Sequence, residues 1–552
     1  MGEGRRDERV WARSGLATLP GPERGVPIRI AALLLSFLLL PIPATRAAYP
    51  IHADPQLEER IDTLIRRSVE LIYDGQVDSA QAAVDAAAAL APTDPRVDLF
   101  RYRVLRENYP DDLNEESRAV RLIPSLNAPL DRAIARCDSI LALRPKDPAG
   151  TLYRGWAHMM KAQNHAIAGQ IWAAGSESRK GKGDLDRYLE KHGDDPDAGV
   201  IVGGYLYFAD ILPSIVKFVK FFARVPSGNK TEGLRLLARG AAATGTYTGL
   251  DSKVVLNVIN YLFEGRIDES VAAFEDLAAK YPYSPRLAEL LGSTAFIFPE
   301  KSQAAIDAQT RVVDGWRTRV RGYDDLYYYR ILWFRARLSN QVGEHEAARH
   351  DLERIVEAAP PDPFWLMPRA LIGLANLSSS MGDADAAHRY AARVLAEDRW
   401  SRYHAQARPY RDVRTSRRQQ DLFRALAGVR QDLYGRAPDP EAARRRVLEV
   451  RREFGEDPRV RFLDAEVHRE LGEIAEAREG YRTIADAAND TGFESTRLMS
   501  CLRLGEIALA AKEYNEAKRR FEQAREVESG LTLLGNVIRG RLRYIDEAKK
   551  GR

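Results

Sequence analysis

The chain has 552 residues, of which 83 are basic and 79 are acidic, so its formal net charge is only +4. This balance argues against nucleic-acid binding, which uses concentrated positive charge. Two basic runs, at 408–418 and 444–452, are flanked by acidic residues and are interpreted as solvated helix faces. The only two cysteines, Cys137 and Cys501, are far apart in the chain, so we expect buried thiols rather than a disulfide.

Residues 1–47 differ from the rest of the chain. Basic residues lead into an apolar run at 30–40, which is followed by Pro41, Pro43 and small residues. This is the pattern of a secretory signal near residues 28–47, and its apolar run is short for a membrane span. We therefore expect an exported protein, periplasmic or associated with the cell envelope. An uncleaved anchor is the alternative.

A spaced pattern of small and large apolar residues recurs through the rest of the chain. A glycine permits the turn between two antiparallel helices, a small residue lets them approach closely, and a bulky one fills the gap between neighbouring pairs. A proline often ends the second helix. The turn position is held by Gly75, Gly265, Gly343, Gly382, Gly472 and Lys512, the small position by Ala80, Ser270, Ala348, Ala387, Ala477 and Ala517, and the bulky position by Val84, Phe274, Leu352, Ala391, Tyr481 and Phe521.

The spacing of these segments indicates a repeat. Gly343 and Gly382 are 39 residues apart, and the 78 residues from Gly265 to Gly343 leave room for one diverged unit near 285–321. Over most of residues 57–545 the pattern resembles the tetratricopeptide repeat superfamily, whose units have about 34 residues. The resemblance implies an all-α, right-handed α-solenoid of antiparallel helix pairs that binds proteins. In such an array we expect distant units not to touch.

Five regions follow from the pattern. They are a signal region at 1–47, N-terminal helical repeats at 48–197, a divergent apolar insert at 198–250, central tetratricopeptide repeats at 251–400 and C-terminal tetratricopeptide repeats at 401–552.

The insert carries a second resemblance. Residues 203–241 resemble the central block of the eukaryotic inclusion-body-clearance tetratricopeptide family, through Leu212 and Pro213 and then through Gly228, Asn229, Lys230, Gly233 and Leu234. This implies a helical repeat protein of poorly defined biochemical role. Because glycine weakens an exposed helix, the three glycines at 199, 203 and 204 predict a helix packed closely against a neighbour.

The stretch 214–225 predicts an apolar helix with a narrow cationic stripe. We favour its burial within the solenoid. The alternative is docking on a membrane surface or a partner, and its contact residues would be Phe218, Phe221, Phe222, Lys217, Lys220 and Arg224.

No segment predicts a catalytic, cofactor or metal site. Ser214 and Lys217 spell a Ser-x-x-Lys motif, but the companion motifs of penicillin-binding enzymes crowd into the same helical stretch. Residues 175–182 imitate a phosphate loop but have five residues between the glycines, and we interpret them as a flexible basic loop. The nine histidines show no metal-ligand spacing. We therefore expect a protein that is not an enzyme.

The first helix of each unit lines the concave groove in this repeat class, so its exposed positions are candidates for partner contact. The candidates are Arg330, Trp333, Arg337, Asn340, Arg369, Asn376, Arg459 and Arg469. Asparagine bonds a peptide backbone and arginine pairs with a carboxylate, which predicts a groove at 329–380 for an acidic or C-terminal peptide. The alternative is that these are ordinary exposed and interunit residues. The resulting hypothesis is a non-catalytic, exported scaffold. A membrane-associated assembly factor docking through 214–225 is the alternative, and the oligomeric state stays open.

Overall fold

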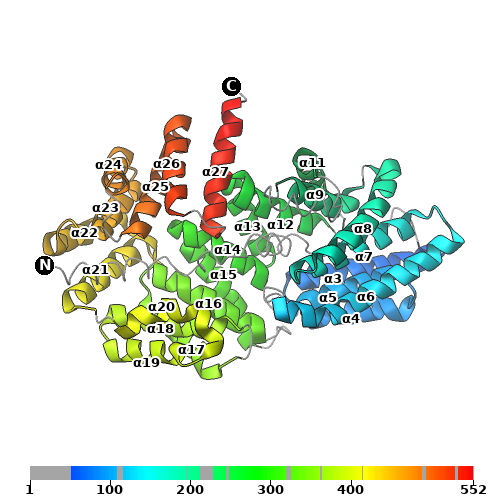
Figure 1. The fold of residues 1–552 in the computed structure, drawn as a ribbon, viewed down its shortest axis with the longest axis horizontal. Helices are drawn as coiled ribbons and strands as arrows, with labels where there is room; N and C mark the ends of the chain where they lie inside the picture. The colour runs from blue at the N-terminus through cyan, green and yellow to red at the C-terminus, as the bar shows by residue number, and fades with distance from the viewer. Residues whose placement is uncertain are drawn as a thin grey trace. The chain divides into compact units, whose positions relative to one another are not determined.

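The computed structural model describes residues 51–107, 116–193, 195–211, 228–243, 246, 248–318, 325–360, 364–412, 415–487, 493–528 and 532–550. Every regular element among these residues is a helix (Figure 1), so the predicted all-α fold class is confirmed. Packing groups the chain into two compact units. The N-terminal unit runs through Ile259, and the C-terminal unit comprises Asn260–Arg317 and the chain from Asp325 onward.

Short connections join several successive helices of the N-terminal unit, such as the three residues between α3 and α4. Proline begins α3, α5, α7 and α9, where its missing N–H removes no intrahelical bond. The helices are α3 (Pro55–Tyr73), α4 (Val77–Leu90), α5 (Pro95–Glu107), α6 (Glu116–Leu143), α7 (Pro148–Ile167), α8 (Ile171–His192), α9 (Pro196–Ile211), α11 (Lys230–Ala242) and α12 (Gly249–Ile259).

The C-terminal unit continues the alternation of first and second helices. It contains η2 (Asn260–Glu264), α13 (Ile267–Lys280), α14 (Pro285–Ile297), η3 (Pro299–Lys301), α15 (Ser302–Arg317), α16 (Asp325–Gln341), α17 (His345–Ala358), α18 (Leu366–Met381), α19 (Ala384–Leu395), η4 (Asp398–Trp400), α20 (Ser401–Asp412), α21 (Arg417–Tyr434), α22 (Pro440–Phe454), α23 (Pro458–Glu470), α24 (Ile474–Ala485), α25 (Glu494–Ala510), α26 (Tyr514–Val527) and α27 (Leu533–Lys550). The diverged unit expected near 285–321 is the pair α14 and α15.

The turns between paired helices confirm the repeat frame. All five predicted turn glycines have a positive φ, from 70° at Gly265 to 95° at Gly382, a backbone region that glycine enters without strain. Lys512 adopts the same conformation with φ 59°. The small residues of the frame are buried in the core between the helices of each pair. Cys137 and Cys501 are also buried, as free thiols.

The phosphate-loop imitation at 175–182 was predicted to be a flexible loop, and this prediction is wrong. The stretch lies within α8, which packs antiparallel to α7 across the turn at Gly169. A Cβ on Gly181 would lie 2.7 Å from Met159 Cγ and 2.9 Å from the backbone oxygen of Gly155. Gly181 therefore permits close packing between two helices and is not part of a loop.

The glycines of the insert behave as predicted at two of three positions. A Cβ on Gly203 would lie 2.8 Å from the backbone oxygen of Gly233 on α11, and one on Gly199 would lie 3.1 Å from the backbone oxygen of Leu236. The helices α9 and α11 thus pack with their backbones nearly in contact. Gly204 has no such neighbour within 4 Å.

Distant repeats touch within the C-terminal unit, contrary to the expectation from an open solenoid. Arg541 on α27 donates to the backbone oxygen of Gly265 at 2.6 Å. Gln431 on α21 donates to the backbone oxygen of Gly343 at 2.9 Å, and a Cβ on Gly343 would lie 2.3 Å from the oxygen of Ala427. The turns of the central repeats therefore support the C-terminal first helices, a contact that depends on how the helices curve through space.

Candidate partner-binding site

The central repeats hold a set of alternating arginine and aromatic side chains, here called the arginine–aromatic stack: Phe296, Trp333, Arg337, Trp365 and Arg369. The guanidinium of Arg337 lies 4.2 Å from the ring centroid of Phe296 and 4.6 Å from that of Trp333. Arg369 lies 5.4 Å from Trp333 and 5.0 Å from Trp365. The two indoles meet edge to face at 5.0 Å. Three successive first helices, α14, α16 and α18, with the turn before α18, thus build one site.

Helical spacing explains the stack. Trp333 and Arg337 are one turn apart on α16, so their side chains share a stripe. Trp333 is buried, whereas Arg337 and Arg369 are partly exposed. The rings attract the guanidinium groups by cation–π interaction. The N–H groups of Arg337 have no hydrogen-bond acceptor among the described residues and suit an in-plane acceptor.

Arg337 lacks an acidic partner. No hydrogen bond or ion pair engages its guanidinium within the described part of the chain; its contacts are the two rings. Burial and, to a smaller extent, the positive charge of Arg369 together lower the pKa of Arg337 to about 9. A desolvated cation near a second cation is electrostatically unfavourable, and an anion bound beside Arg337 would compensate its charge.

The other central candidates have different surroundings. Arg330 is buried and ion-paired with Glu289 at 2.7 Å, so it serves packing between α16 and α14. Asn376 donates to the Tyr410 hydroxyl at 2.9 Å. The partly exposed side chain of Asn340 lies on the same stripe as Arg337, with no hydrogen bond to any described residue.

A further pair extends the same chemistry and was missed by the sequence reading. Arg402 on α20 lies 5.3 Å from the ring of Phe364 and 5.2 Å from the ring of Tyr403. The sequence shows aromatic residues near the first helices, and these could have indicated such a pair. Their pairing with arginines of the next unit depends, however, on how one unit packs against another.

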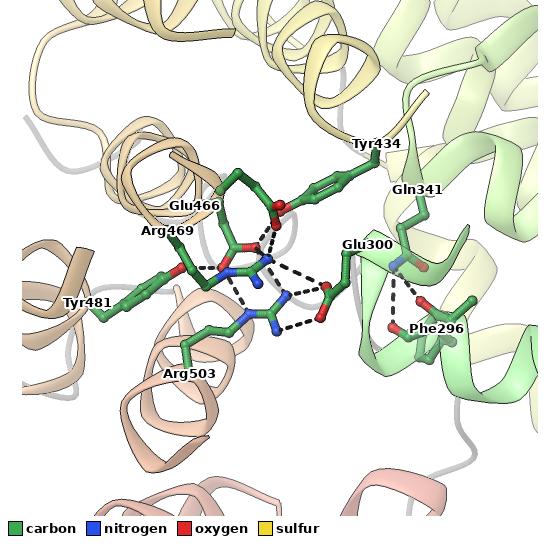
Figure 2. Close-up of polar contacts among 10 residues, drawn as sticks. Phe296, Glu300, Gln341, Tyr434, Glu466, Arg469, Tyr481 and Arg503 are labelled. Atoms are coloured by element: carbon green, nitrogen blue, oxygen red, sulfur yellow. Dashed lines mark hydrogen bonds and ion pairs between the residues drawn. The ribbon is translucent and has the colours of Figure 1, made fainter. Parts of the chain in front are cut away.

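Arg469 lies in a second cluster of opposite character, shown in Figure 2 and here called the Glu300 cluster: Glu300, Tyr434, Glu466, Arg469, Tyr481 and Arg503. Arg503 bonds Glu300 at 3.0 Å and Glu466 at 2.9 Å. Arg469 pairs with Glu466 at 3.1 Å. The two tyrosine hydroxyls donate to Glu466. These contacts tie η3 to α23 and α25, more than 160 residues away in the chain.

Electrostatics in this cluster are balanced. Burial alone would raise the pKa of Glu466, but Arg503, Arg469 and the two hydroxyls outweigh that effect and hold the pKa at about 2. Burial also opposes ionisation of Glu300, and the same arginines again prevail, so the pKa of Glu300 is lowered. The guanidinium of Arg469 is therefore already engaged by carboxylates of its own chain.

Arg459 lies between two phenyl rings, 5.2 Å from Phe423 and 5.3 Å from Phe493. Unlike Arg337, it also has a carboxylate partner, since it bonds Asp457 at 2.7 Å and 2.9 Å. This second sandwich belongs to α21, α23 and the residue preceding α25.

The remaining predictions concern metal ligands, membrane spans and the docking segment 214–225. Within the described ranges, no three acidic, histidine or cysteine side chains gather as metal ligands, and no helix is long and apolar enough to cross a membrane. The predicted docking residues Phe218, Phe221, Phe222, Lys217, Lys220 and Arg224 lie outside the described residues, as does the signal region. Docking through 214–225 stays a prediction from the sequence.

Comparisons with known proteins give no family. No protein-family model matches the chain, and no curated protein matches it; the likeness to the inclusion-body-clearance family therefore stays a resemblance. Among solved structures, the human IFIT1 dimer with PPP-AAAA aligns with 84% of this chain and 95% of its own at 12% identity and a TM-score of 0.31. The P58(IPK) TPR domain aligns with 79% and 99% at 12% identity and 0.20, and the APC/C hetero-tetramer Cut9–Hcn1 with 90% and 91% at 11% identity and 0.26. These scores are too low to support an argument, so the repeat architecture rests on the turns and packing of this chain itself.

Proposed function

We propose that this protein is a non-catalytic scaffold that binds an acidic or C-terminal peptide of a partner protein through the arginine–aromatic stack. The observation that carries the proposal is the guanidinium of Arg337, held between Phe296 and Trp333 with no carboxylate of its own. A planar carboxylate suits the free N–H edges of such an arginine. The surrounding indoles offer apolar contact to neighbouring peptide side chains.

The signal-like sequence supports a location for this scaffold. Its apolar run and the following small residues fit export, so we place the protein in the cell envelope. Mass spectrometry of the protein purified from an envelope fraction should give an N-terminus close to residue 48. An N-terminus upstream of residue 30, together with recovery in the soluble cytoplasmic fraction, would count against export.

Peptide capture tests the binding proposal directly. Fluorescence anisotropy with a dye-labelled hexaglutamate peptide should show binding at low salt, and a hexaglutamine peptide of the same length should bind at least about tenfold more weakly. Charge reversal at Arg337 and Arg369 should weaken hexaglutamate binding by about tenfold or more, a loss of about 1.4 kcal/mol.

The matched control reverses two arginines on the outer helices, Arg349 on α17 and Arg393 on α19, which are both exposed. It changes net charge equally and should change affinity by less than about twofold. Equal losses in the two double variants would mean that net charge rather than the stack attracts the peptide.

Once peptide binding is established, affinity capture from envelope extracts should identify the natural partner. It is the species that the wild-type protein retains and the protein with reversed charges at Arg337 and Arg369 does not.

A further inference from the structure

A second arginine without a carboxylate lies beyond the stack. Arg430 on α21 is partly buried, and no hydrogen bond or ion pair engages it within the part of the chain that the structure describes. Its neighbours along the helix fix its surroundings: Gln431 bonds the backbone oxygen of Gly343, and Tyr434, one turn on, bonds Glu466 on α23. Arg430 therefore lies where α21 meets the turn after α16 and faces α23.

The charges around Arg430 add to its own. Burial lowers the pKa of Arg430, and the positive charge of Arg459 lowers it further. The charge of Arg430 also acts on His345, the first residue of α17. Burial and Arg430 together, opposed by Glu346, lower the pKa of His345 to about 4. The carboxylate of Asp457 is already bonded to Arg459. The groups that act on Arg430 therefore include a second arginine and a histidine, and no carboxylate among the described residues bonds its guanidinium.

The helix α16 links this place to the stack. Trp333, Arg337 and Asn340 form one stripe, which leads to the turn at Gly343. Gly343 follows Arg337 by six positions, which corresponds to a rise of about 9 Å at helical spacing. Side chains of arginine length at both ends place the two guanidinium groups roughly 12–20 Å apart, which an extended peptide spans in about four to six residues.

We propose that Arg430 is a second anion anchor for the same ligand, so that the bound peptide carries two acidic groups about four to six residues apart. One group meets the Arg337 and Arg369 pair, the other meets Arg430, and Asn340 lies between them to bond the peptide backbone. The inference rests on the proposed peptide binding and adds the length and charge pattern of the ligand. Two tethered contacts raise affinity because the second forms at high effective concentration.

Three labelled peptides of nine residues test the spacing, each built on glycine and serine with blocked ends. One carries a single glutamate, one carries two glutamates separated by four residues, and one carries two adjacent glutamates. With wild-type protein the separated pair should bind at least about tenfold more tightly than either other peptide. In Arg430→Met this advantage should fall below about twofold, because the variant keeps the length of the side chain but not its charge.

The controls separate this inference from the proposed function. Arg424→Met removes an exposed arginine of the same helix that is paired with Asp421 and should leave the advantage intact. Arg337→Met should weaken all three peptides. Suppose that Arg337→Met weakens all three peptides. If Arg430→Met then preserves the tenfold advantage, or if the wild type shows no advantage, the proposal that Arg430 is a second anchor is wrong, whereas peptide binding at Arg337 is retained. If Arg337→Met changes none of the affinities, the proposed function fails. Thermal unfolding of each variant confirms that it is folded.

Discussion

The arginine–aromatic stack and the Glu300 cluster lie in the same unit and use the same residue type for opposite purposes. In the Glu300 cluster, Arg469 and Arg503 are matched by the carboxylates of Glu300 and Glu466. Two tyrosine hydroxyls, from α21 and α24, also donate to Glu466. In the stack, Arg337 is matched only by aromatic rings. A desolvated cation that is paired with an anion can contribute to the fold, whereas a desolvated cation without an anion favours the binding of one. The presence of a carboxylate partner, and not the residue type, distinguishes the Glu300 cluster from the proposed binding site.

The largest effect should come from Glu466, which is buried and accepts bonds from four side chains. Glu466→Ala leaves Arg503 and Arg469 short of negative charge, and we expect a loss of about 3–5 kcal/mol in the free energy of unfolding. Urea denaturation at neutral pH measures it. The exposed Glu479→Ala should lose less than about 0.5 kcal/mol, and equal losses would remove the distinction between the cluster and the surface.

Glu300→Gln should show how far the cluster fastens distant repeats. The amide retains the shape of the side chain but not its charge, so we expect a loss of about 1–3 kcal/mol. Hydrogen exchange should accelerate in η3 and in α23 and α25, which Glu300 ties together (Figure 2), and not in α27. Uniform acceleration throughout the unit would mean that this contact has no local role.

Arg337→Met should not lower the free energy of unfolding, in contrast to the two substitutions in the Glu300 cluster. Because the cation is desolvated and has no acid to stabilise it, replacing it by an apolar side chain of similar length should leave the unfolding free energy unchanged or raise it by about 1 kcal/mol. Arg503→Met, which removes a paired arginine, should lower it by about 3 kcal/mol. A similar loss for both variants would contradict the comparison between the two sites.

The smallest effect concerns pH. The folded protein holds His345 neutral, with its pKa lowered to about 4 by burial and by Arg430, whereas the unfolded chain protonates it near its ordinary value of 6.5. The unfolded state therefore binds more protons between these values, and the two pKa values by themselves correspond to about 2–3 kcal/mol. Because His345 is only partly buried and solvent screens its interactions, we expect stability to fall on the order of 1 kcal/mol as pH drops from 6.5 to 4. His345→Gln should reduce that fall by a similar amount in thermal melts across the range. A parallel pH profile for variant and wild type would exclude His345 as a contributor.

Much of the fold could be predicted because the repeat depends on local rules. Gly75, Gly265, Gly343, Gly382 and Gly472 marked turns that need a positive φ, and all five have one. The candidate site was predicted less evenly. Trp333, Arg337 and Arg369 were identified from helix positions and lie together, while Arg330 and Arg469 came from the same rule and are occupied by Glu289 and by Glu466 and Glu300. The position of a residue along a helix predicts the face on which it lies. It does not predict which side chain of a neighbouring helix pairs with it.

The sequence by itself determined the helix pairs, their turns and the glycine contacts between α9 and α11, because each follows from spacing within a few dozen residues. Only the tertiary structure decided that Glu300 meets Arg503 across 203 residues and that the turn at Gly343 supports α21. Those contacts depend on small rotations accumulated from one repeat to the next, which no single repeat encodes. They also decide which arginines have an acid and which remain to bind one.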